Sequence, residues 1–558
     1  MTPASCNIAA ALPRLAAERP DQPAIRCPGR RRPGNGLAAY DVVLDYATLD
    51  ARSDAIAAGL ARHGIGRGVR TVVMVRPSPE FFLLMFALFK VGAVPVLVDP
   101  GIDRRALKQC LDEARPEAFI GIPLALLAKA LLGWAKSARV RITTGRRAWL
   151  ADATLADVER DGAGAGPQLA DTAPDDVAGL LFTSGSTGVP KGVVYRHRHF
   201  VAQVGMLRDA FGIEAGGIDL PTFPPFALFD PALGLTSIIP DMDPTRPAKA
   251  DPRKLHAAIR RFGVTQLFGS PALMRVLAGH GEPLPAVRRV TSAGAPVPPE
   301  VVARMLALLP PDAQLWTPYG ATECLPVAVI EGRELLALRE RTEAGSGTCV
   351  GRPVARNTVR IIRIDDGAIA DWSDALRVAP GQVGEITVAG PSATDAYFNR
   401  DAQTALAKIR ERLPDGGERI VHRMGDLGWF DADGRLWFCG RKSQRIVVDA
   451  VTTLCTEQVE PVFNAHPGVA RTALVGTGAQ GKQSPVLCVE LNAGIGKREW
   501  PRIERELRHL GEGFVHTAKV DTFLRYPKPF PVDIRHNAKI GRETLARWAA
   551  ARRNGERA

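Results

Sequence analysis

Apolar and polar positions follow two rhythms in the first part of the chain. Short apolar runs of strand length alternate with segments whose apolar residues recur at helical spacing. The apolar runs cover 69–75, 93–98 and 118–122, and the helical segments cover 48–63, 80–90 and 106–114. Strands that alternate with helices in this order form parallel sheets, so the pattern predicts an α/β fold with a doubly wound sheet. In such sheets ligands bind beyond the carboxyl ends of the strands.

A second alternation follows and then changes character. Residues 150–175, rich in Ala, Gly and Asp, are expected to form a connecting loop. Further helices are predicted at 199–211, 252–262, 271–278 and 299–309, and further strands at 264–268 and 287–292. From residue 384 short strands and turns resemble a barrel-like subdomain, and past residue 441 the pattern is that of a compact α+β unit. The sequence thus predicts a large N-terminal domain, 1–441, and a small C-terminal domain, 442–558.

Composition places the 558 residues among water-soluble globular proteins, with 46% hydrophobic and 23% charged residues. The longest apolar run, 81–89, ends at Lys90 and is too short to span a bilayer. No basic segment followed by an apolar core marks the N-terminus as a secretory signal. Eight scattered cysteines without a CxxC pair predict neither structural zinc nor a disulfide framework. A cytoplasmic protein without a transmembrane segment is expected.

The net charge of +13 raises the question of a nucleic-acid or membrane partner. The excess is spread over short arginine clusters, at 30–32, 146–147, 260–261 and 552–553. Aromatic residues make up only 6% and do not alternate with these clusters, so no base-stacking platform is visible. This argues against nucleic acid as the main ligand, whereas weak attraction to anionic partners or lipid surfaces stays open.

The most distinctive stretch follows the apolar residues 177–182. It consists almost entirely of hydroxyl, glycine and lysine residues: Thr183, Ser184, Gly185, Ser186, Thr187, Gly188, then Val189-Pro190, and Lys191. Glycines allow main-chain N–H groups to approach a ligand, hydroxyls add donors, and a lysine adds positive charge. It is not a Walker A loop, because two residues separate Gly188 from Lys191. The stretch predicts a polyphosphate cradle, with a flexible surface loop as the alternative.

Two later segments carry further candidate chemistry. The first, Gly294-Ala295-Pro296, follows a predicted strand, and its small residues would let a flat ring approach the backbone. On its own it is better explained as a turn. The second is Tyr319-Gly320-Ala321-Thr322-Glu323. Here an aromatic ring can stack on a purine, a hydroxyl can bind phosphate, and a carboxylate can hold Mg²⁺.

Together these segments resemble the signature blocks of the adenylate-forming enzymes, which include acyl-CoA synthetases, luciferases and nonribosomal-peptide adenylation domains. The resemblance continues through Gly384-Glu385-Ile386, the run His422 to Leu427, Gly440-Arg441 and Asn537-Ala538-Lys539-Ile540. The blocks stand in the family's order and cover essentially the whole chain. The run at 422–427 departs from the family's Y-R-T-G-D-L at two positions, His422 and Met424.

The resemblance implies ATP, Mg²⁺ and a carboxylic acid that becomes an acyl-AMP. It implies catalytic roles for Lys539, Glu323, Thr183 and Lys191, with Glu323 holding the metal. It implies ATP contacts from 183–188, Lys191, 294–296, 319–323, Asp426, Arg441 and Lys539. It places the hinge between the domains at Lys442. Neutralising charge at the α-phosphate is the physical need, because both the carboxylate and the triphosphate are anionic.

The acceptor of the acyl group is the point where this chain departs from most of the family. The segment 447–460 contains no glycine and no proline, where a glycine normally borders the pantetheine channel. The aromatic–histidine pair of the acyl-pocket block is also missing, and Pro224 to Asp230 stands there. A β-hydroxyl within the substrate would need no such channel. The chain resembles olefin β-lactone synthetases, which act on 2-alkyl-3-hydroxy acids. The resemblance lies in residues 7–9 near the N-terminus and in the segments 183–196, 223–230 and 535–539.

The hypothesis is therefore an ATP-dependent β-lactone synthetase of long-chain hydrocarbon synthesis. It would act beside that pathway's reductase and lactone decarboxylase, possible partners in a complex. Candidate acyl-pocket residues are Phe223, Phe226, Phe229 and Leu233, with plain core packing as the alternative. A long-chain acyl-CoA synthetase or a carrier-protein-loading ligase is the rival enzyme. A non-catalytic nucleotide sensor is the rival from another class, against which the intact Lys191, Glu323, Asp426 and Lys539 argue.

Overall fold

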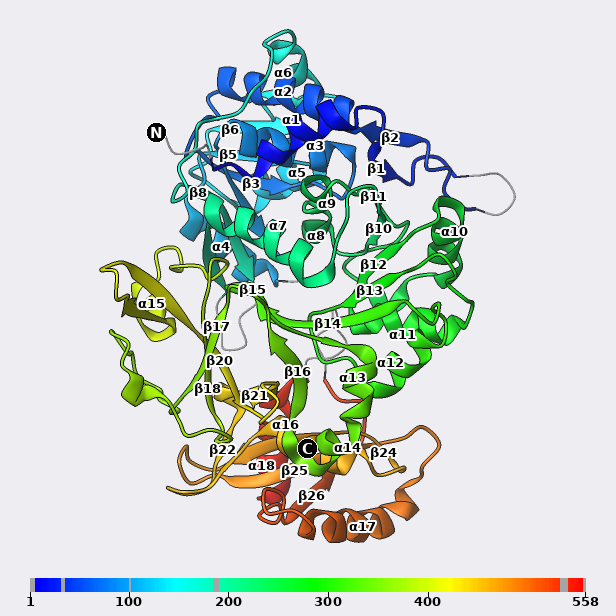
Figure 1. Ribbon diagram of the computed structural model, residues 1–558, viewed down its shortest axis with the longest axis vertical. Coiled ribbons are helices and arrows are strands. Elements are labelled where there is room, and N and C mark those ends of the chain that lie inside the picture. The colour runs from blue at the N-terminus through cyan, green and yellow to red at the C-terminus, as the bar shows by residue number, and fades with distance from the viewer. Residues whose placement is uncertain (1–5, 32–35, 100–101, 184–189, 532–539, 555–558) are drawn as a thin grey trace.

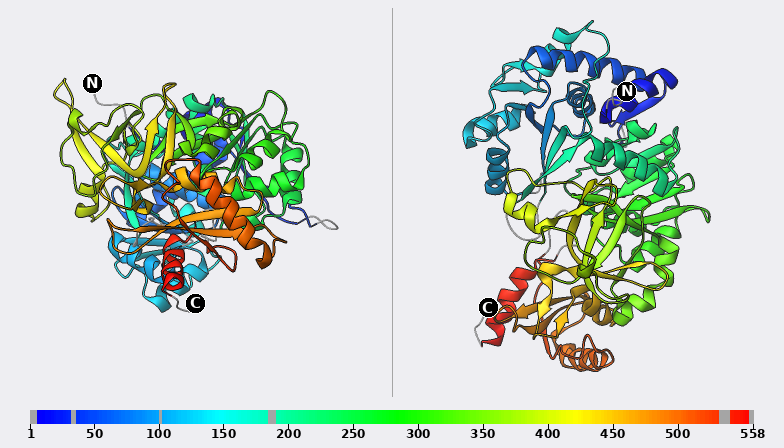
Figure 2. Two further views of the ribbon diagram at one scale, coloured as in Figure 1. Left: turned by 90° about the horizontal axis from the view of Figure 1, so that it is seen from below. Right: turned by 60° about the vertical axis from the view of Figure 1, so that its left-hand side comes forward.

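A computed structural model describes residues 6–31, 36–99, 102–183, 190–531 and 540–554 (Figure 1). Two sheets with their helices form the larger part of the molecule, and a smaller unit built from the last hundred or so residues lies at one end of its long axis (Figure 2). None of the helices in these ranges is long and apolar enough to cross a bilayer.

The first sheet has seven strands in the order β7-β6-β5-β3-β4-β8-β9. All neighbours pair in parallel except β8 and β9. The strands are β3 (Arg70–Met74), β4 (Val94–Val98), β5 (Ala118–Gly121), β6 (Val140–Thr143), β7 (Ala153–Thr154), β8 (Val177–Thr183) and β9 (Lys191–Arg196). The crossover helix α3 (Pro79–Lys90) is buried from Phe81 to Lys90, which explains its unbroken apolar run. The doubly wound α/β fold is confirmed here.

The second sheet contains a parallel section that includes the strands β11-β10-β12-β13-β14. These are β10 (Ile218–Pro221), β11 (Thr236–Ile238), β12 (Gln266–Gly269), β13 (Arg289–Ser292) and β14 (Gln314–Ala321). The helices between them are α10 (Pro252–Phe262), α11 (Pro271–His280) and α12 (Pro299–Leu306), each beginning with proline at its first position. On the other side of β11, β1 (Pro23–Cys27) pairs with it in parallel, and β2 (Val42–Asp45) pairs antiparallel with β1 at the edge of the sheet.

The same sheet continues beyond β14 as antiparallel strands in the order β15-β16-β21-β20-β18-β17. They comprise β15 (Cys324–Glu331), β16 (Thr348–Pro353), β17 (Thr358–Ile362), β18 (Gly384–Ala389), β20 (Glu418–Phe430) and β21 (Leu436–Arg441). A further strand, β19 (Lys408–Arg412), pairs with β20. The strands β18 to β21 lie in the region of short strands and turns that the sequence predicted from residue 384, whereas β15, β16 and β17 precede it. In this order β16 pairs with β15 on one side and with β21 on the other.

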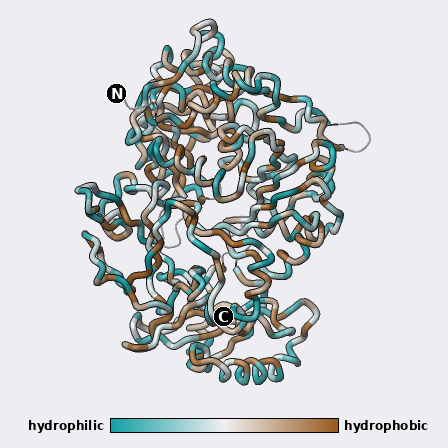
Figure 3. Tube along the Cα trace, in the orientation of Figure 1, coloured by the Kyte–Doolittle hydropathy of each residue, from teal (hydrophilic) through white to brown (hydrophobic). Residues whose placement is uncertain are grey.

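The C-terminal unit begins after β21. It holds the hairpin β22 (Ile446–Val447) and β23 (Thr453–Leu454), helix α16 (Thr456–Asn464), and the sheet of β24 (Val469–Thr477), β25 (Ser484–Leu491) and β26 (Thr522–Arg525). Helices α17 (Trp500–Glu512) and α18 (Arg542–Arg553) pack on this sheet. Along α17 hydrophobic and hydrophilic positions alternate (Figure 3), because only one face is buried. A separate apolar cluster around Phe463 and Leu474 forms the unit's own core.

One predicted loop contains a helix. Within 150–175, α6 (Leu155–Gly162) begins with a capping box, in which the Thr154 hydroxyl accepts from the Asp157 N–H at 3.1 Å and Asp157 accepts from the Thr154 N–H at 3.0 Å. At the other end, a side chain on Gly162 would collide with α2 (Tyr46–Arg62), 1.9 Å from the Ala55 carbonyl oxygen. Gly162, one of the small residues on which the loop prediction depends, therefore serves close helix packing.

Candidate active site

A cavity of about 1150 Å³ lies beyond the carboxyl ends of β12, β13 and β14 and reaches the C-terminal unit. Its wall includes eleven of the residues that the sequence singled out for ATP. They are Lys191, Gly294, Ala295, Pro296, Tyr319, Gly320, Ala321, Thr322, Glu323, Asp426 and Arg441. The location is the one expected for a ligand in an open α/β sheet.

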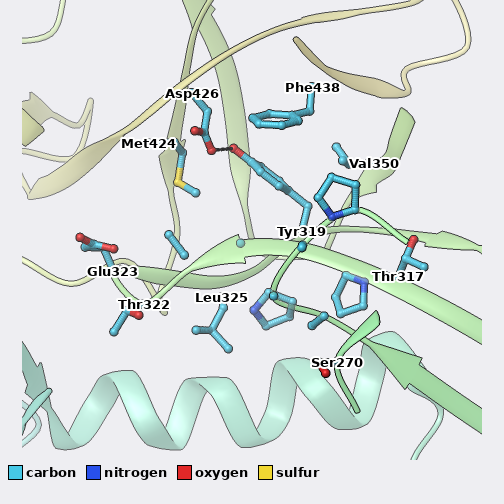
Figure 4. A pocket seen from close by; sticks show the side chains of 18 of the residues that line it. Ser270, Thr317, Tyr319, Thr322, Glu323, Leu325, Val350, Met424, Asp426 and Phe438 are labelled. Atoms are coloured by element: carbon cyan, nitrogen blue, oxygen red, sulfur yellow. Dashed lines mark hydrogen bonds between the residues drawn. The ribbon is translucent and has the colours of Figure 1, made fainter. Parts of the chain in front are cut away.

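Tyr319, Asp426 and Arg441 meet on one side of this cavity. The Tyr319 hydroxyl donates to Asp426 Oδ2 at 2.6 Å (Figure 4), and Arg441 Nη1 lies 2.8 Å from Asp426 Oδ1. Asp426 and Arg441 are direct partners in the β20–β21 pairing, so strand register fixes the ion pair. Burial raises the pKa of Asp426, and the positive charge of Arg441 opposes this shift. The result is a buried carboxylate held by two donors beside an aromatic ring.

Close backbone packing explains the glycine within the segment 319–323. A side chain on Gly320 would lie 2.9 Å from the Cys324 carbonyl oxygen, at the irregularity between β14 and β15. Tyr319 before this glycine points toward Asp426, whereas Thr322 and Glu323 after it lie together, away from that pair (Figure 4).

Glu323 is held from two directions. One carboxylate oxygen, Oε1, accepts from the Tyr397 hydroxyl at 2.6 Å, and its main-chain oxygen accepts from the N–H and hydroxyl of Thr394 at 2.8 and 3.0 Å. Lys191 Nζ lies 4.9 Å from the centre of the Tyr397 ring, a cation–π distance. Burial and the neighbouring Glu323 raise the pKa of Tyr397, so its hydroxyl stays a donor. Tyr397 thus connects the two residues predicted for metal and phosphate.

The residue predicted as hinge is tied to the larger part of the molecule. Lys442 Nζ lies 3.0 Å from Glu385 Oε1 and donates to the Asp365 carbonyl oxygen at 2.7 Å. Glu385, from the block expected to be structural, also pairs with the buried Arg423 at 2.6 Å. One buried carboxylate therefore holds two cations at the point where β21 leads into the C-terminal unit.

The match to a known family covers residues 12–398, and that family is the AMP-binding enzymes. The chain belongs to this family. It is 72% identical over 548 residues to an olefin beta-lactone synthetase of Xanthomonas campestris pv. campestris, covering 98% of each chain. A second enzyme of that name, from Stenotrophomonas maltophilia, is 72% identical over 546 residues, again with 98% of each chain covered. The sequence resemblance to AMP-forming ligases, and to these synthetases among them, is confirmed.

Solved structures of other proteins share the fold of this chain. The amide bond synthetase McbA from Marinactinospora thermotolerans superposes with a TM-score of 0.74 at 22% identity, covering 97% of this chain and 99% of the other. The O-succinylbenzoate coenzyme A synthetase from Bacillus subtilis, in complex with AMP, gives 0.72 at 19% identity, with 96% and 97% covered. At such identities the likeness concerns the fold alone.

All four acyl-pocket candidates of this AMP-binding enzyme line the cavity. Two short helices carry or flank them, α8 (Pro224–Ala227) and α9 (Asp230–Leu233). The rings of Phe223 and Phe226 are 5.4 Å apart, and Phe226 lies 4.5 Å from Phe268 on β12. Phe229 lies 6.3 Å from Phe200 of the helix α7 (His197–Phe211). They form a cavity wall as well as packing contacts.

Some predicted residues lie outside the described part of the AMP-binding enzyme. These are Ser184, Gly185, Ser186, Thr187, Gly188 and Lys539. Thr183 ends β8 and pairs with Lys191 on β9, so the described residues bring both ends of the phosphate stretch together. Pro531 and Ile540, which flank the segment of Lys539, line the cavity.

Sequence reasoning passed over Tyr397, Lys408 and the position of His422. Lys408 is buried and donates to the carbonyl oxygen and hydroxyl of Thr394, beneath Glu323, and burial lowers its pKa to about 8. His422 lines the cavity with Nδ1 3.2 Å from the Ala407 carbonyl oxygen. Burial and the nearby Lys408 lower the pKa of His422, which keeps the ring neutral. The only signal was the departure of position 422 from the family's tyrosine.

Proposed function

We propose that this enzyme activates a long-chain 2-alkyl-3-hydroxy acid with ATP and closes it to a β-lactone, releasing AMP and diphosphate. The observation that carries the proposal is 72% identity over 98% of the chain to two olefin beta-lactone synthetases. The cavity supports it, since adenylation groups and aromatic side chains share one continuous wall. Such enzymes belong to bacterial hydrocarbon synthesis, and we extend the proposal to that pathway.

In the first step the substrate carboxylate attacks the α-phosphorus of ATP, and the bond to diphosphate breaks. Asp426 and Arg441 are suited to the ribose, because a carboxylate fixed by two donors accepts further hydroxyl donors. The stretch Thr183 to Lys191 would hold the phosphates, and Lys539 would neutralise charge at the α-phosphate. Positive charge is required, since two anions must meet.

A magnesium ion fits the groups around Glu323. Tyr397 occupies Oε1 of this carboxylate, which fixes its orientation, and the carboxylate lines the cavity. An oxygen ligand in a phosphate site is what Mg²⁺ prefers, and the ion supplies charge neutralisation of the phosphates when bound. We therefore propose Glu323 as its protein ligand.

In the second step the β-hydroxyl oxygen attacks the acyl carbonyl carbon. The new carbon–oxygen bond closes the four-membered ring, the bond from the carbonyl to the phosphate oxygen breaks, and AMP leaves with that electron pair while the hydroxyl loses its proton. Water competes for the same mixed anhydride, so the aromatic residues Phe226 and Phe229 of the cavity wall have the second task of excluding it.

The proposal includes two domains, 1–441 and 442–558, with Lys442 as the hinge. The separate apolar core around Phe463 supports a C-terminal domain that folds as its own unit. The contacts of Lys442 with Glu385 and Asp365 support a hinge whose position is set by charge. We also propose that the enzyme is cytoplasmic and forms a complex with the pathway's lactone decarboxylase and reductase. Co-purification of tagged proteins would test this complex.

The experiment is incubation of the pure protein with ATP, Mg²⁺ and a long-chain 2-alkyl-3-hydroxy acid, without coenzyme A, and identification of the product by NMR. A β-lactone with one AMP per product molecule is expected. If turnover begins only when coenzyme A is added and the product is a thioester, the proposal is wrong and the protein is an acyl-CoA synthetase.

A further inference from the structure

One end of the cavity is polar, although the cavity wall near α8 is aromatic. Asp219 on β10 lies opposite Gln266 on β12, and Gln266 lies opposite Arg289 on β13. On the other side Asp219 lies opposite Ser237 on β11. Residues in direct register across a parallel sheet project from the same face, so these four side chains form one polar row. Asp219, Gln266 and Arg289 line the cavity.

The polar row is completed by a carboxyl group from α9, and hydrogen bonds link its members, although Arg289 Nε has no partner among the described residues. Asp230 is hydrogen-bonded to Asp219 and accepts from the Ser237 hydroxyl. Arg289 Nη1 donates to Gln266 Oε1 at 2.7 Å, and Nη2 donates to the Gly212 carbonyl oxygen at 3.0 Å. Both aspartates are more than nine-tenths buried. Burial raises the pKa of Asp219 to about 7, which lets the pair share a proton.

The polar row closes the inner arm of the cavity. It stands three residues before the carboxyl ends of β12 and β13, or about 10 Å deeper than those ends. Gln266 and Arg289 are the first residues of β12 and β13, and Ile218, which precedes Asp219 on β10, is not part of the cavity wall. Next to the row Gly217 packs closely against Gln266, since a side chain on Gly217 would lie 2.6 Å from Gln266 Nε2. Phe211, another wall residue, packs edge-on against Trp316 at 6.0 Å.

Another part of the cavity wall reaches the molecular surface, and we call it the outer arm. Its wall consists of Phe223, Ser270 and the loop residues Pro244, Thr245 and Pro247. Phe223 is 44% exposed, so this arm reaches the molecular surface. A substrate branched at C2, with one alkyl chain on C2 and another beyond C3, requires two such arms.

We propose that the polar row of Ser237, Asp219, Gln266 and Arg289, together with Asp230, sets an upper limit on the length of one of the substrate's two alkyl chains, while the outer arm leaves the other chain unrestricted. This inference rests on the proposed function for the nature of the substrate. It assigns specificity to residues that take no part in adenylation.

The physical reason is that the row cannot give way to a hydrocarbon. A longer chain would have to separate Arg289 from Gln266 or part the two aspartates, leaving buried polar groups without partners. Because each methylene in an apolar pocket changes kcat/KM by about tenfold or more, a chain one or two carbons too long should be rejected clearly. The outer arm carries no such cost, since excess chain emerges at the surface.

The test measures kcat/KM for AMP release with two series of racemic 2-alkyl-3-hydroxy acids. One series lengthens only the 2-alkyl chain, and the other lengthens only the chain beyond C3. A steep fall beyond one length in a single series, and a shallow profile in the other, is expected. Equal profiles in both series would overturn the inference.

The variant Arg289→Ala should move that limit to longer chains while substrates below the limit keep their kcat/KM within a few-fold. Arg289→Met, which fills much of the same volume without the charge, serves as a second variant if the alanine protein does not fold. Arg288→Ala is the matched control, because the neighbouring arginine is 57% exposed in its side chain and does not line the cavity. An unmoved limit in a folded Arg289 variant would refute the role of the row.

Product identity in the same reactions separates this inference from the proposed function. A thioester or free acid in place of the lactone would remove the proposed function and, with it, the two-chain argument. If the lactone forms but the dependence of kcat/KM on chain length is the same in the Arg289 variants and the wild type, the proposed function stands. Only the role of the polar row as the length limit is then refuted.

Discussion

Tyr397 and Glu323 are joined by a 2.6 Å hydrogen bond, although 74 residues separate them in the chain. The bond fixes one oxygen of the carboxylate and leaves the group facing the cavity. The same ring lies beneath Lys191 Nζ. A single tyrosine therefore sets the relative position of the proposed metal ligand and of a proposed phosphate ligand.

Removal of the Tyr397 hydroxyl should weaken the dependence of acyl-AMP formation on Mg²⁺. We expect Tyr397→Phe to lower Mg²⁺-dependent acyl-AMP formation by about 10- to 100-fold, the usual effect of losing a partner that orients a metal ligand. The Mg²⁺ concentration for half-maximal rate should rise, measured by diphosphate release over a magnesium series. Tyr46→Phe, which removes a hydroxyl bonded to the Leu235 carbonyl at 2.9 Å, is the control. An unchanged magnesium curve for Tyr397→Phe would count against the assignment.

Asp426 offers a test of nucleotide binding. Asp426→Asn should raise the KM for ATP by about tenfold or more, since hydrogen bonds to charged groups contribute about 1.5–3 kcal/mol. Tyr319→Phe keeps the carboxylate and its Arg441 partner and should have a smaller effect. Both variants can be followed by ATP titration of diphosphate release. If the two effects were equal, the carboxylate would have no role of its own in holding the nucleotide.

Local signals explain which elements the sequence could predict. The helix predicted at 252–262 has those bounds in the structure, because Asp251 caps it, Pro252 begins it and Gly263 ends it with φ of +60°. The prediction of a loop over 150–175 is wrong at 155–162, because Ala and Gly are not confined to loops and the Thr154–Asp157 capping box starts a helix there. A cap is a local feature that could have been found.

The order of the site blocks was visible in the sequence, but their mutual contacts were not. Asp426 and Arg441 were each marked by a motif, and their pairing follows from strand register. Tyr397 and Asp219 carry no local pattern of their own. Their significance comes from partners brought in by the fold, Glu323 in one case and Asp230 in the other. Such residues become recognisable only when strand order is known.

Lys539 is expected to act in adenylation and not in ATP binding. Lys539→Ala should reduce acyl-AMP formation by about 100-fold or more, the scale for losing one donor at a developing charge. ATP affinity, measured by equilibrium binding, should stay within a few-fold. Lys528→Ala, an exposed lysine of the same unit, is the control. Near-normal diphosphate release by the Lys539 variant would rule out this role.

The buried aspartates predict how stability depends on pH. The pKa of Asp219 is raised to about 7 by burial, above its ordinary value near 3.8. Between these values Asp219 of the folded protein holds a proton that the unfolded chain has lost, so the contribution of Asp219 to the free energy of unfolding should fall as pH rises, by at most about 1.4 kcal/mol per pH unit. The contribution is fully present below pH 3.8 and is lost as pH rises through about 7. Asp219→Asn cannot lose this proton, so its stability should decline less between pH 5 and pH 8, measured by urea unfolding at each pH. An equal decline in the wild type and the variant would show that the buried pair does not hold the extra proton.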